Sequence, residues 1–478
     1  MHDLKSKTVK GGFFLTITSV LNQVVAIVLN IVLARLLLAE DFGIVALSTT
    51  YIGFIAVFTN ISFGSSVIHF ADMNKNQIST LYWLDLMTKV FSFLIVFFTA
   101  QFVADYYEKP ELTNIIRATS LFILLYPFFI VQHKILERDL KFNITSKIIV
   151  IATVLSAVVA IVGAFCGLGV YALVLQVLSL TFFRLIFTLK YCKWRPNFYF
   201  KFNEVREMFW YSLKYDLGNG FQYITRNIDY LIMGKLFSSK IIGYYAFSYN
   251  IMYTPVKRVS NVFNDILFPS LSKVKDDLQK MKIGYFKSKQ LVAMIVFPVM
   301  TLVALNAELI IEFVFGSKWL EAVPIIRILC FAGAFQSITQ FTSAVFASLG
   351  KPEITTYISV VRTIMTIAAI VIGSFYGILT VVWLLLISKI VDWILTHILL
   401  RLYLKFDLRD FWKYLKGILV CVLFLFMLEY VFTFSQFTEL HINATLKLVF
   451  ETLLAFLITM LFYKSIIIDL YKTIRKKV

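Results

Sequence analysis

Residues 145–189 read TSKIIVIATVLSAVVAIVGAFCGLGVYALVLQVLSLTFFRLIFTL, and this stretch decides the fold class. It contains two apolar runs, 145–165 and 168–189, which are separated by a very short connection. A membrane-spanning α-helix needs about 20 mostly apolar residues. Each run has that length, so the stretch predicts two spanning helices joined by a tight turn.

The composition of the whole chain agrees with this reading. Of its 478 residues, 59% are hydrophobic and only 15% are charged, whereas soluble domains carry about 25% charged residues. Inside a bilayer every backbone polar group must be satisfied within its own segment, which favours helices. We therefore expect an all-α, polytopic membrane protein.

The same length criterion finds about 14 candidate spans along the chain. They lie near residues 11–35, 42–68, 78–104, 112–132, 145–165, 168–189, 205–234, 241–268, 286–306, 322–348, 353–373, 377–400, 413–434 and 444–464. With the N-terminus placed inside, 30 Lys and Arg residues fall in cytoplasmic segments and 5 in external ones. Because cytoplasmic loops are enriched in Lys and Arg, this bias predicts that both termini are cytoplasmic.

An internal repeat divides the chain. Residues 34–47 (ARLLLAEDFGIVAL) align with residues 234–247 (GKLFSSKIIGYYAF), so that Gly43 matches Gly243 and Arg35 matches Lys235. The two segments join equivalent pairs of predicted spans, and halves that repeat in parallel pack around a substrate path. We predict an N-terminal six-helix lobe (1–200), a C-terminal six-helix lobe (201–405), and two additional transmembrane helices with a basic tail (406–478).

Three predicted spans carry polar stripes. In span 205–234 they are Asn219, Gln222, Arg226 and Asp229, at three- and four-residue steps, with Lys214 and Asp216 nearer the cytoplasm. Span 241–268 carries Arg258 and Asp265, and span 11–35 carries Asn22 and Asn30. Such steps place side chains on one helical face, and a polar face within a membrane indicates water or protein beside it. We expect these helices to line a hydrated cavity whose excess of cations suits an anion.

Other polar residues suggest structural roles. Asp85 and Lys89, and Lys389 and Asp392, have the spacing of ion pairs within a helix. Neither function nor chemistry is assigned to the scattered histidines His69, His397 and His441. The four cysteines lie far apart and contain no CxxC pair, so neither a metal site nor a disulfide is expected.

Several function classes are disfavoured. The net charge of +18 is spread between apolar segments, which fits membrane topology rather than nucleic-acid binding. No connection exceeds roughly 20 residues, whereas a catalytic domain needs at least ~50. There is no GxxxxGK[ST] phosphate-binding motif. A membrane enzyme such as a glycan polymerase is therefore disfavoured, and we expect no enzymatic activity.

The chain resembles Wzx-type flippases, in the polysaccharide-transporter branch of the multidrug/oligosaccharidyl-lipid/polysaccharide exporter superfamily. The segments that carry the resemblance are KGGFFLTITSVLNQVVAIVLNIVLARLLLAEDFGIVAL (10–47), ILERDLKF (135–142), GLGVYALVLQ (167–176), FGSKWLEAVPIIRIL (315–329) and ASLGKPE (347–353). The resemblance implies 14 transmembrane helices, arranged as two six-helix lobes and two additional helices. It also implies a multi-pass protein of the bacterial cytoplasmic (inner) membrane. It also implies an undecaprenyl-pyrophosphate-linked oligosaccharide as cargo, flipped to the periplasmic leaflet by rocking of the lobes.

The resemblance implies no cofactor, leaves coupling to a H+ or Na+ gradient open, and suggests a polysaccharide polymerase and a chain-length regulator as partners. Its quoted motifs do not include the polar stripes, whose roles rest on depth and spacing. We hypothesise that Arg226, Arg258 and Lys214 attract the pyrophosphate, and that the amides Asn22, Asn30, Asn219 and Gln222 bind sugar. Asp216, Asp229 and Asp265 would balance charge or couple ions.

Two alternatives come from the same superfamily. A multidrug cation antiporter would have acids dominating its cavity, whereas bases dominate here. A lipid II flippase would differ mainly in its cargo.

Overall fold

The computed structural model describes residues 2–59, 61, 63–70, 72–272 and 277–407, with a few further positions between 416 and 454. Over these ranges its regular secondary structure is helical, as predicted. Nine of the described helices are long and apolar enough to cross a membrane, or ten if one bent pair forms a single span. The protein is thus a multi-pass membrane protein. The predicted spans 413–434 and 444–464 lie outside these ranges, so the total of 14 and the position of the termini stay predictions.

The chain forms two compact units, Met1–Gly243 and Tyr244–Val478, and each is described by itself. The first contains α1 (His2–Leu36), α2 (Ala39–Thr59), α3 (Gly64–His69), α4 (Lys75–Tyr107), α5 (Glu111–Leu125), α6 (Pro127–Arg138), α7 (Phe142–Phe165), α8 (Val170–Tyr191), the 3₁₀ turn η1 (Phe202–Val205) and α9 (Arg206–Leu236). Helix α10 (Ser239–Ser272) begins in this unit and continues into the second.

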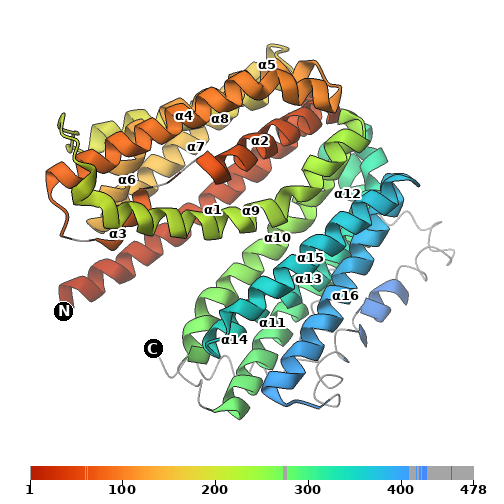
Figure 1. Cartoon of the computed structure of the whole chain (residues 1–478). Coiled ribbons are helices and arrows are strands. Elements are labelled where there is room, and N and C mark those ends of the chain that lie inside the picture. Colours follow the sequence, from red (N-terminus) through yellow and green to blue (C-terminus); the bar gives the residue numbers. More distant parts are fainter. Residues whose placement is uncertain are drawn as a thin grey trace. The chain divides into compact units, whose positions relative to one another are not determined.

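The stretch that predicted two spans forms α7 and α8, which pack side by side (Figure 1). Gly167 and Gly169 of the turn between them have φ angles of +78° and +53°, a region that residues other than glycine enter at a cost. Helix α7 also packs against α1, where Ala157 and Ala160 meet Leu33. Small residues let helices approach closely in a membrane, where packing drives their association.

The segment predicted as one span at 112–132 is broken. Helices α5 and α6 meet at a bend of 46°. Pro127 is the first residue of α6, and its missing N–H and its ring cannot continue the hydrogen-bond ladder of α5. The proline explains why a continuous apolar run does not give a straight helix.

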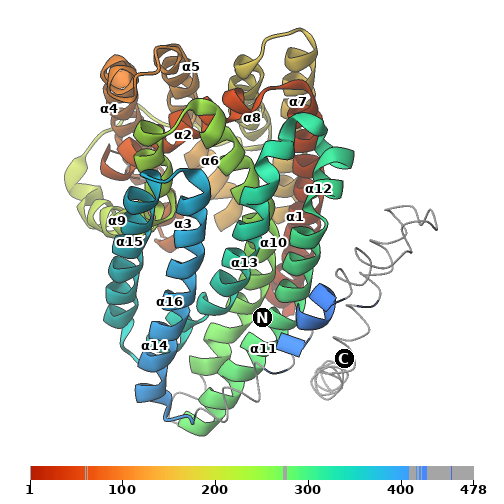
Figure 2. The ribbon, with the colours of Figure 1, turned by 90° about the vertical axis from the view of Figure 1, so that its right-hand side faces the viewer.

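The second unit contains α11 (Leu278–Leu305), α12 (Ala307–Ile310), the π turn η2 (Ile311–Phe315), the 3₁₀ turn η3 (Ser317–Ala322), α13 (Val323–Thr339), α14 (Thr342–Ser348), α15 (Pro352–Ser374) and α16 (Ile378–Leu404). Helix α13 packs against both α11 and α16, and α16 packs against α15 (Figure 2). Asp277 begins α11 because its side chain accepts a hydrogen bond of 3.0 Å from the backbone N–H of Lys280.

The internal repeat is visible in the backbone of the first unit. Helices α1 and α9 end at Leu36 and Leu236, and α2 and α10 begin at Ala39 and Ser239, so both joints keep the same offset of 200 residues. The aligned glycines meet there. A Cβ atom on Gly43 would lie 2.9 Å from the Gly243 nitrogen, which real Cβ atoms essentially never approach. The repeated glycines therefore let the starts of α2 and α10 touch.

Helices α9 and α10 differ from the other long helices. They have 31 and 34 residues, enough to span a membrane, yet neither is apolar enough to count among the nine. They correspond to the predicted spans 205–234 and 241–268, which carry the polar stripes. The lobe boundaries at 200 and 405 follow the sequence repeat rather than packing, and they stay predictions.

Candidate functional site

Helix α9 carries most of the predicted site residues, and its environment differs along its length. Lys214, Gln222 and Arg226 are exposed, Asp216 is half-buried and Asp229 is buried. Asn219 lies in the same helix, and its side chain is outside the described part. Positions 219, 222, 226 and 229 lie in the continuous helix α9, where three- and four-residue steps place them on one side.

The C-terminal end of α9 is held by residues of the α4–α5 connection. Lys109 Nζ donates hydrogen bonds to the carbonyl oxygens of Gly234 (2.8 Å) and Phe237 (3.2 Å). Carbonyls at a helix end lack partners within the helix, so an ammonium group there stabilises it. Lys235 pairs with Glu108 at 2.7 Å, and this pairing lowers the pKa of Glu108. These contacts fix α9 within the first unit.

The other predicted residues lie on α1 and α10. Asn22 of α1 is half-buried, and Asn30 is exposed. Arg258 is exposed on α10, whereas the side chain of Asp265 on the same helix is outside the described part. The residues on α1 and α9 belong to the first unit, and Arg258 and Asp265 belong to the second. A common cavity lined by all of them stays a prediction.

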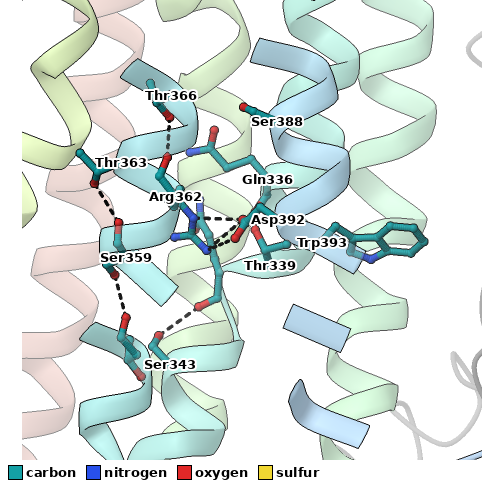
Figure 3. A network of polar contacts seen from close by, with 12 residues as sticks. Gln336, Thr339, Ser343, Ser359, Arg362, Thr363, Thr366, Ser388, Asp392 and Trp393 are labelled. Atoms are coloured by element: carbon teal, nitrogen blue, oxygen red, sulfur yellow. Dashed lines mark hydrogen bonds and ion pairs between the residues drawn. The ribbon is translucent and has the colours of Figure 1, made fainter. Parts of the chain in front are cut away.

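An ion pair with two hydrogen bonds joins α15 to α16 in the second unit. Arg362 Nε and Nη2 donate to the two carboxylate oxygens of Asp392 at 3.0 and 3.1 Å (Figure 3). The Asp392 side chain is 6% exposed and that of Arg362 is 30% exposed. Two parallel charge-assisted bonds fix both position and orientation. Sequence spacing had suggested Lys389 for Asp392, and it did not reveal Arg362, which is 30 residues away.

Uncharged polar residues surround this pair. Figure 3 shows Gln336 and Thr339 of α13 beside it. Along α15 the hydroxyls of Thr363 and Thr366 donate to the backbone carbonyls one turn earlier, at 2.8 and 3.0 Å. These hydroxyls are satisfied within their own helix, so the strong link between α15 and α16 at this level is ionic.

The first unit contains the predicted pair of Asp85 and Lys89. Lys89 Nζ lies 3.5 Å from Asp85 Oδ1, and the two side chains are 5% and 1% exposed. The second carboxylate oxygen of Asp85 is buried without a hydrogen-bond partner among the described residues. The spacing argument is thus confirmed, although the long distance makes this a weaker contact than that of Arg362.

Sequence reasoning missed a buried basic pair, Lys289 and His397. Lys289 lies at the start of the predicted span 286–306, where its charge was counted with the preceding cytoplasmic segment, and His397 was given no role. In the structure Lys289 is fully buried in α11 and its Nζ lies 2.5 Å from His397 Nε2. The helix-starting Asp277 is the signal that could have shown that α11 begins well before Lys289.

No group of three or more His, Cys, Asp or Glu side chains that could hold a metal ion occurs in the described ranges.

Comparison with known proteins places these features in a family. The family model described as "Polysaccharide biosynthesis protein" matches residues 32–324, which is more than half of the chain. The chain belongs to this family. The chain is 25% identical, over 86% of each chain, to the teichuronic acid biosynthesis protein TuaB of Bacillus subtilis (strain 168). It is 23% identical to the lipopolysaccharide biosynthesis protein WzxC of Escherichia coli (strain K12), over 78% of this chain and 76% of WzxC.

The fold of the chain is similar to that of a flippase whose structure is known. The inward closed conformation of the lipid II flippase MurJ aligns with a TM-score of 0.73 over 96% of this chain and 99% of MurJ, at 14% sequence identity. At that identity the likeness establishes the fold alone. Together the comparisons confirm the predicted resemblance to Wzx-type proteins and the polytopic fold.

Proposed function

We propose that this protein is a flippase for undecaprenyl-pyrophosphate-linked oligosaccharide repeat units of an O-antigen, capsule or exopolysaccharide. It moves them by alternating access from the cytoplasmic to the periplasmic or outer leaflet of the bacterial cytoplasmic membrane. The family match and the names of TuaB and WzxC support polysaccharide biosynthesis as its context. A polysaccharide polymerase and a chain-length regulator are the expected partners.

The observation that carries this proposal is the exposed Arg226 on α9. A charged side chain within a span costs at least ~2.5 kcal/mol unless water or a partner is present. Arg226 and Lys214 are nevertheless exposed on a helix that packs against the apolar spans α2 and α4. A hydrated, cationic path resolves this cost. The planar fork of arginine suits phosphate, which it can bind through two hydrogen bonds.

The remaining predicted residues complete the proposed site. Arg258 on α10 would act with Arg226 and Lys214 on the pyrophosphate. The amides Asn22, Asn30, Asn219 and Gln222 would hydrogen-bond the sugars. The acids Asp216, Asp229 and Asp265 would balance charge or couple transport to H+ or Na+. This division of roles needs no cofactor and no chemical step on the cargo.

The proposal is tested by replacing the two arginines in a strain whose surface glycan depends on this protein. Arg226→Ala and Arg258→Ala should each abolish surface polysaccharide while the amount of protein in the membrane stays unchanged. Arg226→Lys should retain partial export because it keeps the charge but loses the planar fork. Arg206→Ala is the matched control, because Arg206 is also exposed and lies at the first residue of α9. Normal surface glycan in both alanine variants would refute the proposal.

The same strains separate the alternative functions. Loss of a repeat-unit flippase should cause undecaprenyl-linked oligosaccharides to accumulate inside the cell. Accumulation of lipid II instead would identify a lipid II flippase. Unchanged lipid intermediates with greater sensitivity to cationic drugs would identify a multidrug antiporter.

A further inference from the structure

A buried pair of basic side chains connects α11 to α16 in the second unit. Lys289 Nζ lies 2.5 Å from His397 Nε2 and 2.9 Å from the hydroxyl of Tyr285. Lys289 is 0% exposed and His397 is 7% exposed. No carboxylate of a described residue lies within ion-pair distance of Lys289. A buried cation that contacts two neutral groups instead of an acid is unusual and calls for a reason.

The histidine is oriented by the backbone of its own helix. His397 Nδ1 lies 2.7 Å from the carbonyl oxygen of Trp393, one turn earlier in α16. A carbonyl only accepts hydrogen bonds, so Nδ1 carries the hydrogen. Nε2 is then the acceptor that faces Lys289. Two nitrogens this close cannot each point a hydrogen at the other, so a single proton lies between them.

The charges around the pair do not cancel. Tyr285 contributes a hydroxyl from α11, and Asp392 of α16 lies next to Trp393, whose carbonyl orients His397. Asp392 already accepts hydrogen bonds from Nε and Nη2 of Arg362 in α15. Helix α13 packs against α11 and α16, and its one charged residue, Arg327, pairs with Glu308 of α12. Among the residues that the structure describes here, Lys289, Arg362 and Asp392 give two cations and one anion, and the excess positive charge in a buried place is costly.

We propose that Lys289 and His397 form a proton-binding site that links α11 to α16 while its proton is bound and weakens this link when the proton leaves. On release the Nζ–H bond breaks, the proton passes to water, and a neutral amine faces a neutral imidazole. The hydrogen bond between the two side chains then loses its charge assistance, which makes it about half as strong. Coupling of this site to transport rests on the proposed flippase function, whereas proton binding itself does not.

The proton site is tested first by NMR of the full chain in lipid nanodiscs, labelled with ¹⁵N-histidine. The protein has only five histidines, and His397→Gln assigns the signals of His397 by their loss. We expect a protonated Nδ1 and a strongly hydrogen-bonded, unprotonated Nε2 at neutral pH. Lys289→Met should move the Nε2 signal to that of an imidazole without this donor and change its response to pH. Lys287→Met, which removes an exposed charge from the same helix, should not. Identical His397 signals in wild type and Lys289→Met would overturn the proposal.

A second measurement separates a proton switch from a static contact. Glutamine at position 397 keeps an oxygen that can accept a hydrogen bond from Lys289. Unlike the imidazole nitrogen, this oxygen cannot share a proton with the amine. Deuterium uptake by α11 and α16, corrected for the intrinsic effect of pH, should rise roughly fivefold in wild type when the proton is lost. It should rise markedly less in His397→Gln. An equal rise in the two proteins would refute the switch.

The use of the site in transport is tested separately from the flippase function. Lys289→Met should reduce surface glycan, whereas Lys287→Met should not. Normal glycan in Lys289→Met, together with loss of glycan in Arg226→Ala, would exclude the proton site from transport and leave the flippase proposal intact.

Discussion

At the scale of single residues, the stability cost of a charged side chain buried in a membrane protein depends on whether a partner of opposite charge is present. Asp392 is buried and bound by two nitrogens of Arg362. Asp392→Asn would leave a partly buried guanidinium without its counter-charge, and breaking such a pair costs about 3–5 kcal/mol. We expect a clearly lower unfolding temperature in detergent micelles. The double variant Arg362→Met/Asp392→Leu should recover much of the loss, because neither charge remains.

The surface pair of Lys141 and Asp139, whose charged atoms lie 3.0 Å apart, provides the control. Lys141→Met should change stability by no more than about 1 kcal/mol, since exposed pairs contribute little. Equal losses of stability in Asp392→Asn and Lys141→Met would contradict the argument.

The sequence could predict the Asp85–Lys89 pair because the two residues lie about one helical turn apart. It could not predict Arg362–Asp392 or Lys289–His397, because packing between helices creates those contacts.

At the scale of elements, the repeated glycines make a steric prediction. A Cβ atom on Gly43 or Gly243 would press against the backbone of the partner segment, at the Ser239 or Ala39 carbonyl. Gly43→Ala and Gly243→Ala should each lower stability by about 1–3 kcal/mol through overpacking, measured by thermal unfolding. Gly284→Ala is the matched control, because its Cβ would meet only the Leu271 side chain at 3.3 Å. There alanine should be neutral or stabilising by about 0.5–1 kcal/mol. Unchanged stability in both Gly43→Ala and Gly243→Ala would contradict the prediction and show that the starts of α2 and α10 can move apart.

The helices also show which structural features the sequence could predict at this scale. Apolar length alone placed the spans that became α7, α8, α15 and α16, since a bilayer requires that length. Length did not reveal the break at Pro127 between α5 and α6. Nor could it show that Gly43 and Gly243 touch. Their alignment was visible in the sequence, but the contact depends on how the two segments cross.

At the scale of the whole molecule, topology is the prediction on which the direction of transport depends. A single miscounted span would invert the sidedness of every later connection. The predicted number of spans depends most on α9 and α10, because their polar residues keep hydropathy alone from identifying them as spans. The hydrated cavity expected between α1, α9 and α10 depends on these two helices being spans, and it stays a prediction.

The native cysteines allow this topology to be measured. Cys166 is exposed in the turn between α7 and α8, whereas Cys192 and Cys330 are buried. The alternation of positive charge predicts that Cys166 faces outward. With the other cysteines replaced by serine, a membrane-impermeant maleimide should label Cys166 in intact cells. In the same background with Cys166→Ser, Lys193→Cys should react only after permeabilisation, because Lys193 is exposed in the basic connection before α9. The opposite pattern would reverse the orientation of the first unit, and the cationic side chains of α9 would then receive their cargo from the other leaflet.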